Sequence, residues 1–168
     1  MIEQHVLDDC QVQLRKLKAQ ADGALRQVDD RQFFQTLDPE ANSIAIIMKH
    51  VAGNMRSRWT DFLTTDGEKP NRHRDDEFIV EGVDDRAHVT AAWDDAWQLV
   101  LQTIASLTPA DLTRTVTIRG EAHTVVEAIN RQMTHYAAHV GQIVLLAKHY
   151  AGENWKTLSM PRNVKGKR

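Results

Sequence analysis

The sequence has only one cysteine, Cys10, among its 168 residues. No disulfide can form within the chain, which suits a reducing compartment, so we expect a cytoplasmic protein. Cys10 falls on the apolar stripe of the first expected helix, and this position predicts a buried, inert thiol. The first ten residues, MIEQHVLDDC, carry acids where a secretion signal needs bases followed by an apolar run.

Excess charge and long apolar runs are also lacking. The formal net charge is −2, and nucleic-acid binding needs a concentrated basic surface, so we expect no nucleic acid partner. No apolar run approaches the length that spans a bilayer, so we expect no membrane association. The sequence contains no glycine-rich phosphate loop, no CxxC pair and no nucleophile elbow. These absences leave an ordinary globular chain, most simply a single domain.

Four long stretches have apolar residues at every third or fourth position, which is typical of amphipathic helices. The first runs from Ile2 to Val28. The second begins at the capping residue Ser43 and ends in TTDGEKP, the third spans His88 to Leu107, and the fourth runs from Thr124 through Tyr150. We expect residues 1–152 to form an all-α four-helix bundle, and residues 153–168 to form a basic, solvated C-terminal tail.

Two of the connections between these helices have sequence patterns that predict local structure. Before the last helix, TRTVTIRGEAHT alternates apolar and polar residues around Gly120, and this pattern predicts a short β-hairpin. Between the second and third helices, NRHRDDEFIVEGVDD is rich in charge but contains Phe78, Ile79 and Val80. We expect an ordered loop whose apolar triplet docks on the bundle, because disordered segments rarely carry such a triplet.

The stretch THYAAHVGQ places His135 and His139 four residues apart on the last helix. Side chains at that spacing are about 6 Å apart along the axis and can reach one ion. A pair is weak evidence, because such pairs also arise by chance on a solvated helix face. His50 lies on the shoulder of the second helix's apolar face and is the best candidate for a third ligand. Gly53, one turn later, is expected to leave open space for a water or a substrate.

Three neutral imidazoles with an open coordination position would make a catalytic rather than a structural metal site. Imidazole ligands suit zinc or nickel better than magnesium or calcium. Such an ion would lower the pKa of a bound water or hold a thiol as its thiolate. We expect Gln132, Gln142 and Asn54 to orient the ligand rings. The sequence identifies no further catalytic side chain.

The stretches NSIAIIMKHVAGNMRSRWTDFLTTDGEKPNRHRDDEF and TVVEAINRQMTHYAAHVGQIVLLAKH resemble the DinB/YfiT-like superfamily, whose members are regarded as metalloenzymes. Within it the chain looks like a small uncharacterised bacterial subgroup, and His50, His135 and His139 match the superfamily's three-histidine pattern. The resemblance implies a four-helix bundle of DinB-like topology, often a homodimer, with nickel or zinc on those histidines. Characterised members include S-transferases and isomerases that use a low-molecular-weight thiol, and others are known only as stress- or damage-inducible proteins.

Two functions follow as expectations. The leading one is a metal-dependent enzyme acting on a small molecule by thiol transfer, with hydrolysis second. The alternative is a non-catalytic interaction protein whose metal site is vestigial. In RHRDDEF, Arg72 or Arg74 could bind an acidic substrate such as a carboxylate-bearing thiol, or fix the loop through local salt bridges, which we favour. Arg131, one turn before His135, is a further candidate for contact with an anion.

Overall fold

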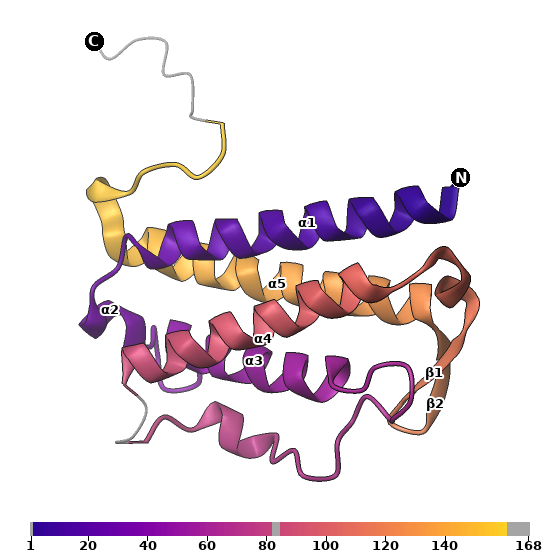
Figure 1. Cartoon of the computed structure of the whole chain (residues 1–168). Coiled ribbons are helices and arrows are strands. Elements are labelled where there is room, and N and C mark those ends of the chain that lie inside the picture. Colours follow the sequence, from indigo (N-terminus) through magenta and orange to yellow (C-terminus); the bar gives the residue numbers. More distant parts are fainter. Residues whose placement is uncertain (1, 82–84, 161–168) are drawn as a thin grey trace.

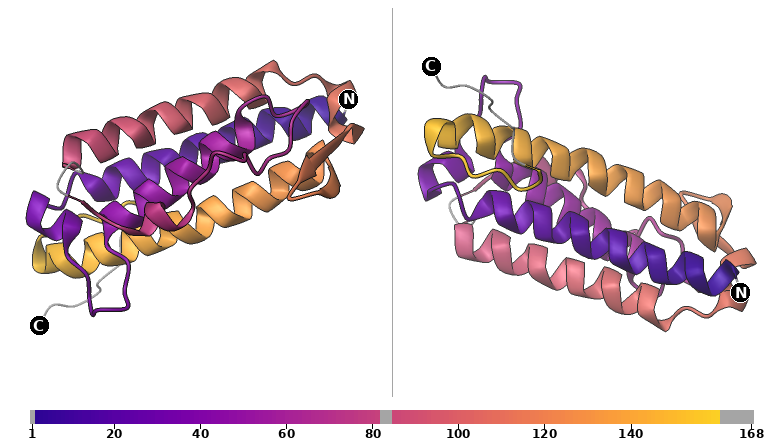
Figure 2. Two further views of the ribbon diagram at one scale, coloured as in Figure 1. Left: turned by 90° about the horizontal axis from the view of Figure 1, so that it is seen from below. Right: turned by 90° about the horizontal axis from the view of Figure 1, so that it is seen from above.

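The computed structural model describes residues 2–81 and 85–160, and these are mostly helical (Figure 1). The described part contains five α-helices: α1 (Ile2–Leu25), α2 (Asp30–Phe34), α3 (Ile44–Trp59), α4 (Arg86–Ser106) and α5 (Val125–Ala151). The four long helices lie side by side, and α2 covers one end (Figure 2). Contacts join α3 to α4, α1 to α5, α1 to α4 and α3 to α5. No described helix is both long enough and apolar enough to cross a membrane.

The directions of α3 and α4 determine the path of the connection between them. Figure 1 shows α3 and α4 running the same way, so the chain returns alongside α3 before α4 can begin. The returning segment contains the 3-10 helix η1 (Asp75–Phe78), which packs against α3. This return brings residues from a polar loop onto the face of α3 that carries His50.

The helix starts follow the capping chemistry in the sequence. The Ser43 hydroxyl accepts a hydrogen bond from Ile46 N, and Thr124 and Glu127 form a reciprocal capping box, so both predicted starts are confirmed. The helix α3 ends at Trp59, earlier than the sequence indicated. The short α2 was not predicted, because five residues are too few to show a helical period.

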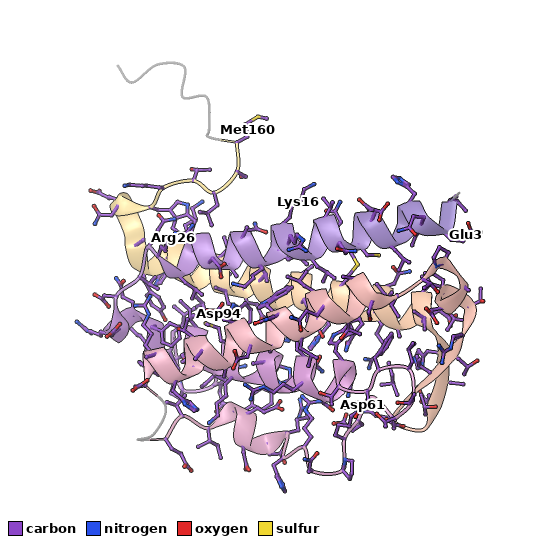
Figure 3. The ribbon with its side chains drawn as sticks, viewed as in Figure 1. Glu3, Lys16, Arg26, Asp61, Asp94 and Met160 are labelled. Atoms are coloured by element: carbon purple, nitrogen blue, oxygen red, sulfur yellow. The ribbon has the colours of Figure 1, made fainter. Side chains whose placement is uncertain are left out.

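The core lies between the four long helices and is rich in large side chains. Trp59, Trp93 and Trp97 are at most 2% exposed, as their helical spacing predicted, and Cys10 is buried. Each buried indole removes enough apolar surface from water to contribute on the order of 5 kcal/mol before entropy is subtracted. By contrast, the labelled Lys16 on α1 extends away from the other helices (Figure 3). These helices therefore form a rigid base for the side chains described below.

The predicted hairpin is present as β1 (Thr115–Ile118) paired antiparallel with β2 (Glu121–Thr124). Its two-residue turn, Arg119 and Gly120, has φ values of 55° and 77°, as tight hairpin turns of the primed types require. The Asp66 carboxylate accepts the backbone N–H of Arg119 at 2.9 Å and of Gly120 at 2.8 Å. These two bonds tie the hairpin to the loop after α3 and fix the position of the Arg119 backbone.

The apolar triplet in the loop does not dock as a unit. Ile79 is 51% exposed and Val80 is 37% exposed, so that expectation was wrong for both, and only Phe78 is partly buried. The buried residue of η1 is Glu77, at 8% exposure. The loop is therefore anchored to α3 mainly by a carboxylate and one aromatic ring.

The first residues of the expected tail pack on α1. Gln27 forms two hydrogen bonds with the backbone of Lys156, at 3.0 and 2.6 Å, and Trp155 and Leu158 pack against the core. The absence of a side chain at Gly23 leaves room for Leu158. Residues 155–158 are thus held against the helices. The other basic residues of the expected tail, Arg162, Lys165, Lys167 and Arg168, lie outside the described residues.

Candidate metal centre

The structure brings three histidines from two helices together. His50 on α3 and His135 and His139 on α5 each offer a ring nitrogen, and these nitrogens lie within 4.8 Å of one another. The Nε2 atoms of His135 and His139 are 3.0 Å apart. The ring of His50 has its centroid 5.6 Å from that of His135 and 5.1 Å from that of His139. We refer to these three residues as the histidine cluster.

The spacing of His135 and His139 suits a single ion. Zinc–imidazole bonds of about 2.0–2.1 Å place neighbouring nitrogens about 2.9 Å apart at a right angle and about 3.4 Å apart at the tetrahedral angle. The 3.0 Å separation of His135 and His139 lies within that range. The three side chains could therefore bind a metal ion, and their nitrogen donors suit zinc or nickel.

Hydrogen bonds hold two of the rings with Nε2 toward the cluster. His50 Nδ1 is 2.9 Å from Glu77 Oε2, and His139 Nδ1 is 2.8 Å from Gln142 Oε1. Oxygen acceptors at Nδ1 favour the tautomer that keeps the Nε2 lone pair free for an ion. His135 Nδ1 is buried and has no hydrogen-bond partner among the described residues, so that ring is held by packing and by the contact of its Nε2 with His139 Nε2.

The two histidines of α5 are electrically neutral at pH 7. Burial is the main cause that lowers the pKa of His135 to about 4, and repulsion from neighbouring basic groups adds to it. Burial also lowers the pKa of His139. Metals bind neutral imidazole, so both rings are in the protonation state that ligation needs.

Glu77 is the centre of a buried ionic network. It accepts two hydrogen bonds from Arg72, both 2.8 Å long, in addition to its contact with His50. Burial alone would raise the pKa of Glu77, but the hydrogen bonds from Arg72 and His50 lower it. The carboxylate is therefore ionised, and it orients His50 while Arg72 balances its charge.

Gly53 allows Glu77 to occupy this position. A Cβ atom at residue 53 would lie only 2.7 Å from the Glu77 carboxyl carbon. The space beside His50 was expected to be open for water or substrate, but the Glu77 side chain fills it on this side. Gly53 therefore makes room for a carboxylate rather than for a ligand, and its neighbours in sequence do not indicate this, because Glu77 comes from a distant loop.

A cavity of about 550 Å³ lies beside the cluster and is lined by His50, His135, Asn54, Thr134 and five arginines. We call it the arginine pocket, after Arg58, Arg72, Arg74, Arg119 and Arg131. All three arginines that the sequence singled out line it. Arg58 and Arg119 were missed. A signal for Arg58 was available, because His50, Asn54 and Arg58 recur every four residues along one face of α3.

Buried polar side chains around Asn54, which lines the pocket, bond to one another. Gln132 Nε2 donates to Asn54 Oδ1 at 3.3 Å, Tyr136 OH donates to the same oxygen at 3.4 Å, and Trp59 donates to Tyr136 OH at 2.8 Å. Of the three residues expected to orient the histidines, only Gln142 contacts one. Asn54 and Gln132 instead join α3 to α5 through their hydrogen bond.

Fold and site together define a mostly helical protein with a candidate three-histidine metal centre. The model of a family described as "Protein of unknown function (DUF1572)" matches residues 1–164, and the chain belongs to that family. A search of curated proteins found no match. The family description names no activity and does not mention the DinB/YfiT-like superfamily, so that relationship stays a prediction.

Proposed function

We propose that the protein is a metal-dependent enzyme in which His50, His135 and His139 hold one zinc or nickel ion. The observation that carries the proposal is the convergence of three ring nitrogens within 4.8 Å, beside a cavity of about 550 Å³. Such an ion would make a bound thiol or water more acidic and so supply a nucleophile near pH 7. Thiol transfer to an electrophile is the favoured reaction, and hydrolysis is second.

The protein's own groups have distinct tasks in this proposal. Glu77 and Gln142 fix the orientation of His50 and His139, and Arg72 keeps Glu77 ionised. The arginine pocket would receive the small-molecule substrate and a low-molecular-weight thiol cosubstrate. The same proposal includes a four-helix bundle of DinB-like topology, a homodimer and a cytoplasmic location, with neither nucleic acid nor membrane as a partner.

Metal binding is tested on protein purified without an affinity tag. Elemental analysis should find zinc or nickel, and calorimetry on chelator-treated protein should give one site per chain. His135→Ala should abolish that site. His149→Ala, at an exposed position on the same helix, is the matched control and should leave it intact. Negligible occupancy, together with unchanged affinity in His135→Ala, would overturn the proposal.

The reaction is tested by turnover of a chromogenic electrophile with a panel of low-molecular-weight thiols. Metal-dependent turnover with one thiol supports the transferase. Metal-dependent hydrolysis in the absence of any thiol would replace the transferase with the second reaction. A panel without any metal-dependent turnover would count against an enzyme.

A non-catalytic interaction protein with a vestigial site remains the second candidate from the sequence. It predicts histidine side chains that point apart and no cavity beside His50. The convergence of the rings and the arginine pocket favour the enzyme over this alternative.

A further inference from the structure

We infer that the arginine pocket selects an anionic small molecule, held by its carboxylate or phosphate group against Arg131 and Arg119 beside the histidine cluster. This inference rests on the proposed function and names the substrate class that the site takes. Its basis is the charge, burial and pairing of the pocket's arginines.

Positive charge exceeds negative charge in the pocket. No acidic residue is among its lining residues in the part of the chain that the structure describes. The carboxylates that bind its arginines are few: Glu68 is shared by Arg58, Arg72 and Arg119, Glu77 binds Arg72, and the exposed Asp75 lies near Arg74. The two carboxylates of Glu68 and Glu77 cannot neutralise the three guanidinium groups of Arg58, Arg72 and Arg119, and partly buried charges are costly without partners. An anion in the pocket would supply the missing partner.

The arginines divide into two groups by burial. Arg58 is 2% exposed and the Arg72 side chain is 5% exposed, and both are tied to Glu68. These two belong to the scaffold that joins α3 to the loop. Arg74, Arg119 and Arg131 are exposed and reach the pocket from three different elements: the segment before η1, the hairpin turn and α5.

Arg131 is the least engaged of the exposed arginines. Its one hydrogen bond, to Gln132 Oε1, is 3.4 Å long, and it forms no ion pair within residues 2–81 and 85–160. Arg119 donates to Glu68 at 2.7 Å, and Arg74 lies 3.6 Å from the exposed Asp75. Arg131 is also one turn before His135, so an anion on its guanidinium would lie close to the cluster. We therefore assign Arg131 the main contact and Arg119 a supporting one.

The shape and the overall charge favour a small molecule. A cavity of about 550 Å³ is within the roughly 300–1,000 Å³ typical of small-ligand sites. The chain as a whole has a net charge of −2, so its positive charge is concentrated locally rather than spread as a nucleic-acid surface. A planar guanidinium binds carboxylate or phosphate with two parallel hydrogen bonds, which gives selectivity over neutral analogues.

Calorimetric titration of the full chain at low ionic strength tests the inference, with three probes: succinate, its uncharged diamide succinamide, and inorganic phosphate. Each is titrated into chelator-treated and zinc-loaded protein. We expect succinate or phosphate to bind in both states and succinamide to bind in neither. The tighter of the two anions then identifies the preferred group.

Arg131→Gln should weaken anion binding at least about tenfold, the effect of losing a charge-assisted hydrogen bond pair. Arg31→Gln, at an exposed position on α2 far along the chain from the pocket residues, removes the same charge and should change affinity little. Circular dichroism and thermal unfolding establish that both variants are folded. Arg119→Lys, which keeps the charge but loses the planar fork, should give a smaller loss than Arg131→Gln.

Equal affinities of Arg131→Gln and Arg31→Gln, or equal binding of succinate and succinamide, would overturn the inference. The metal-free titration separates this failure from that of the proposed function. Arg131-dependent succinate binding without any zinc site would leave the anion pocket standing and remove the enzyme proposal. Zinc binding by the histidines, without any preference for anions, would leave the metal site standing and remove the anion pocket.

Discussion

The Glu77 carboxylate lies 2.9 Å from His50 Nδ1, although 27 residues separate the two in sequence. The contact exists because the chain returns alongside α3 before entering α4 and places η1 over the histidine. Arg72 closes the network on the far side of the carboxylate with two hydrogen bonds. The long connection therefore supports the candidate metal centre directly.

Replacing Glu77 with glutamine should weaken metal binding. Glu77→Gln keeps the shape of the side chain but removes the charge that favours a strongly basic His50, and such orienting groups change metal affinity by roughly 10- to 100-fold. Zinc affinity is measured by competition with a chromogenic chelator. Asp76→Asn, at an exposed neighbouring position in η1, removes an equal charge and is the control. An unchanged zinc affinity in Glu77→Gln would show that the carboxylate does not act through His50.

Adding one methyl group at Gly53 should destabilise the protein. Alanine normally stabilises a helix relative to glycine by up to about 1 kcal/mol, but here the Cβ would collide with Glu77. We expect Gly53→Ala to cost about 1–3 kcal/mol in urea unfolding, as overpacked sites do. Gly141→Ala on α5 has no atom within 4 Å of the new Cβ and should be neutral or stabilising.

A second comparison isolates the cause of that destabilisation. In a Glu77→Ala background the collision is absent, so Gly53→Ala should then cost little or even stabilise. A penalty of the same size in both backgrounds would mean that the Glu77 side chain is not what excludes a methyl group.

The ionic network after α3 should make stability depend on acid pH. Burial alone would raise the pKa of Glu68, but hydrogen bonds from Arg119 and Arg58 lower it from 4.5 to about 2. A carboxyl group with a lowered folded-state pKa contributes its full stability above its unfolded pKa, and loses it as pH falls through its folded pKa. The contribution should be complete above about pH 4.5 and disappear toward pH 2.

Urea unfolding of the wild-type protein and Glu68→Gln checks this dependence. The variant should be less stable at pH 7, and the difference should shrink steadily between pH 4.5 and the lowest pH at which the protein stays folded. Glu153→Gln, at an exposed position in η3, is the control. A difference that stays constant with pH would remove the ion pairs as its cause.

The parts of the fold that the sequence could predict are mainly those set by interactions within a single element or at its ends. The helical period located the four long helices, and the side chains of Ser43 and Thr124 marked two of their starts. His135 and His139 come together through helix geometry alone, and His50 meets them because α3 packs on α5. All of these follow from patterns within one element and the burial of apolar faces.

The contacts made by the returning loop could not be predicted in this way. In the sequence, Glu77 is one of several charged residues in a polar segment. Nothing in the adjacent residues indicates that contacts with Arg72 and His50 make the burial of Glu77 favourable. The apolar character of Ile79 and Val80 predicts that they are buried. Glu77 and Phe78 attach the loop to α3 instead, and Ile79 and Val80 are left exposed. Such pairings depend on the path of the chain in space, which a single sequence specifies only through the whole fold.

Zinc should stabilise the folded chain, because only the folded state brings the three rings together. A ligand that binds only the native state adds about 2.7 kcal/mol when its concentration is one hundred times its dissociation constant, so the thermal midpoint should rise on adding zinc and fall back with a chelator. His139→Ala should lose this response, since two imidazoles remain and the Gln142 hydrogen bond disappears with the ring. His5→Ala, exposed on α1, should keep it. A zinc response of equal size in His139→Ala would place the stabilising site elsewhere on the protein.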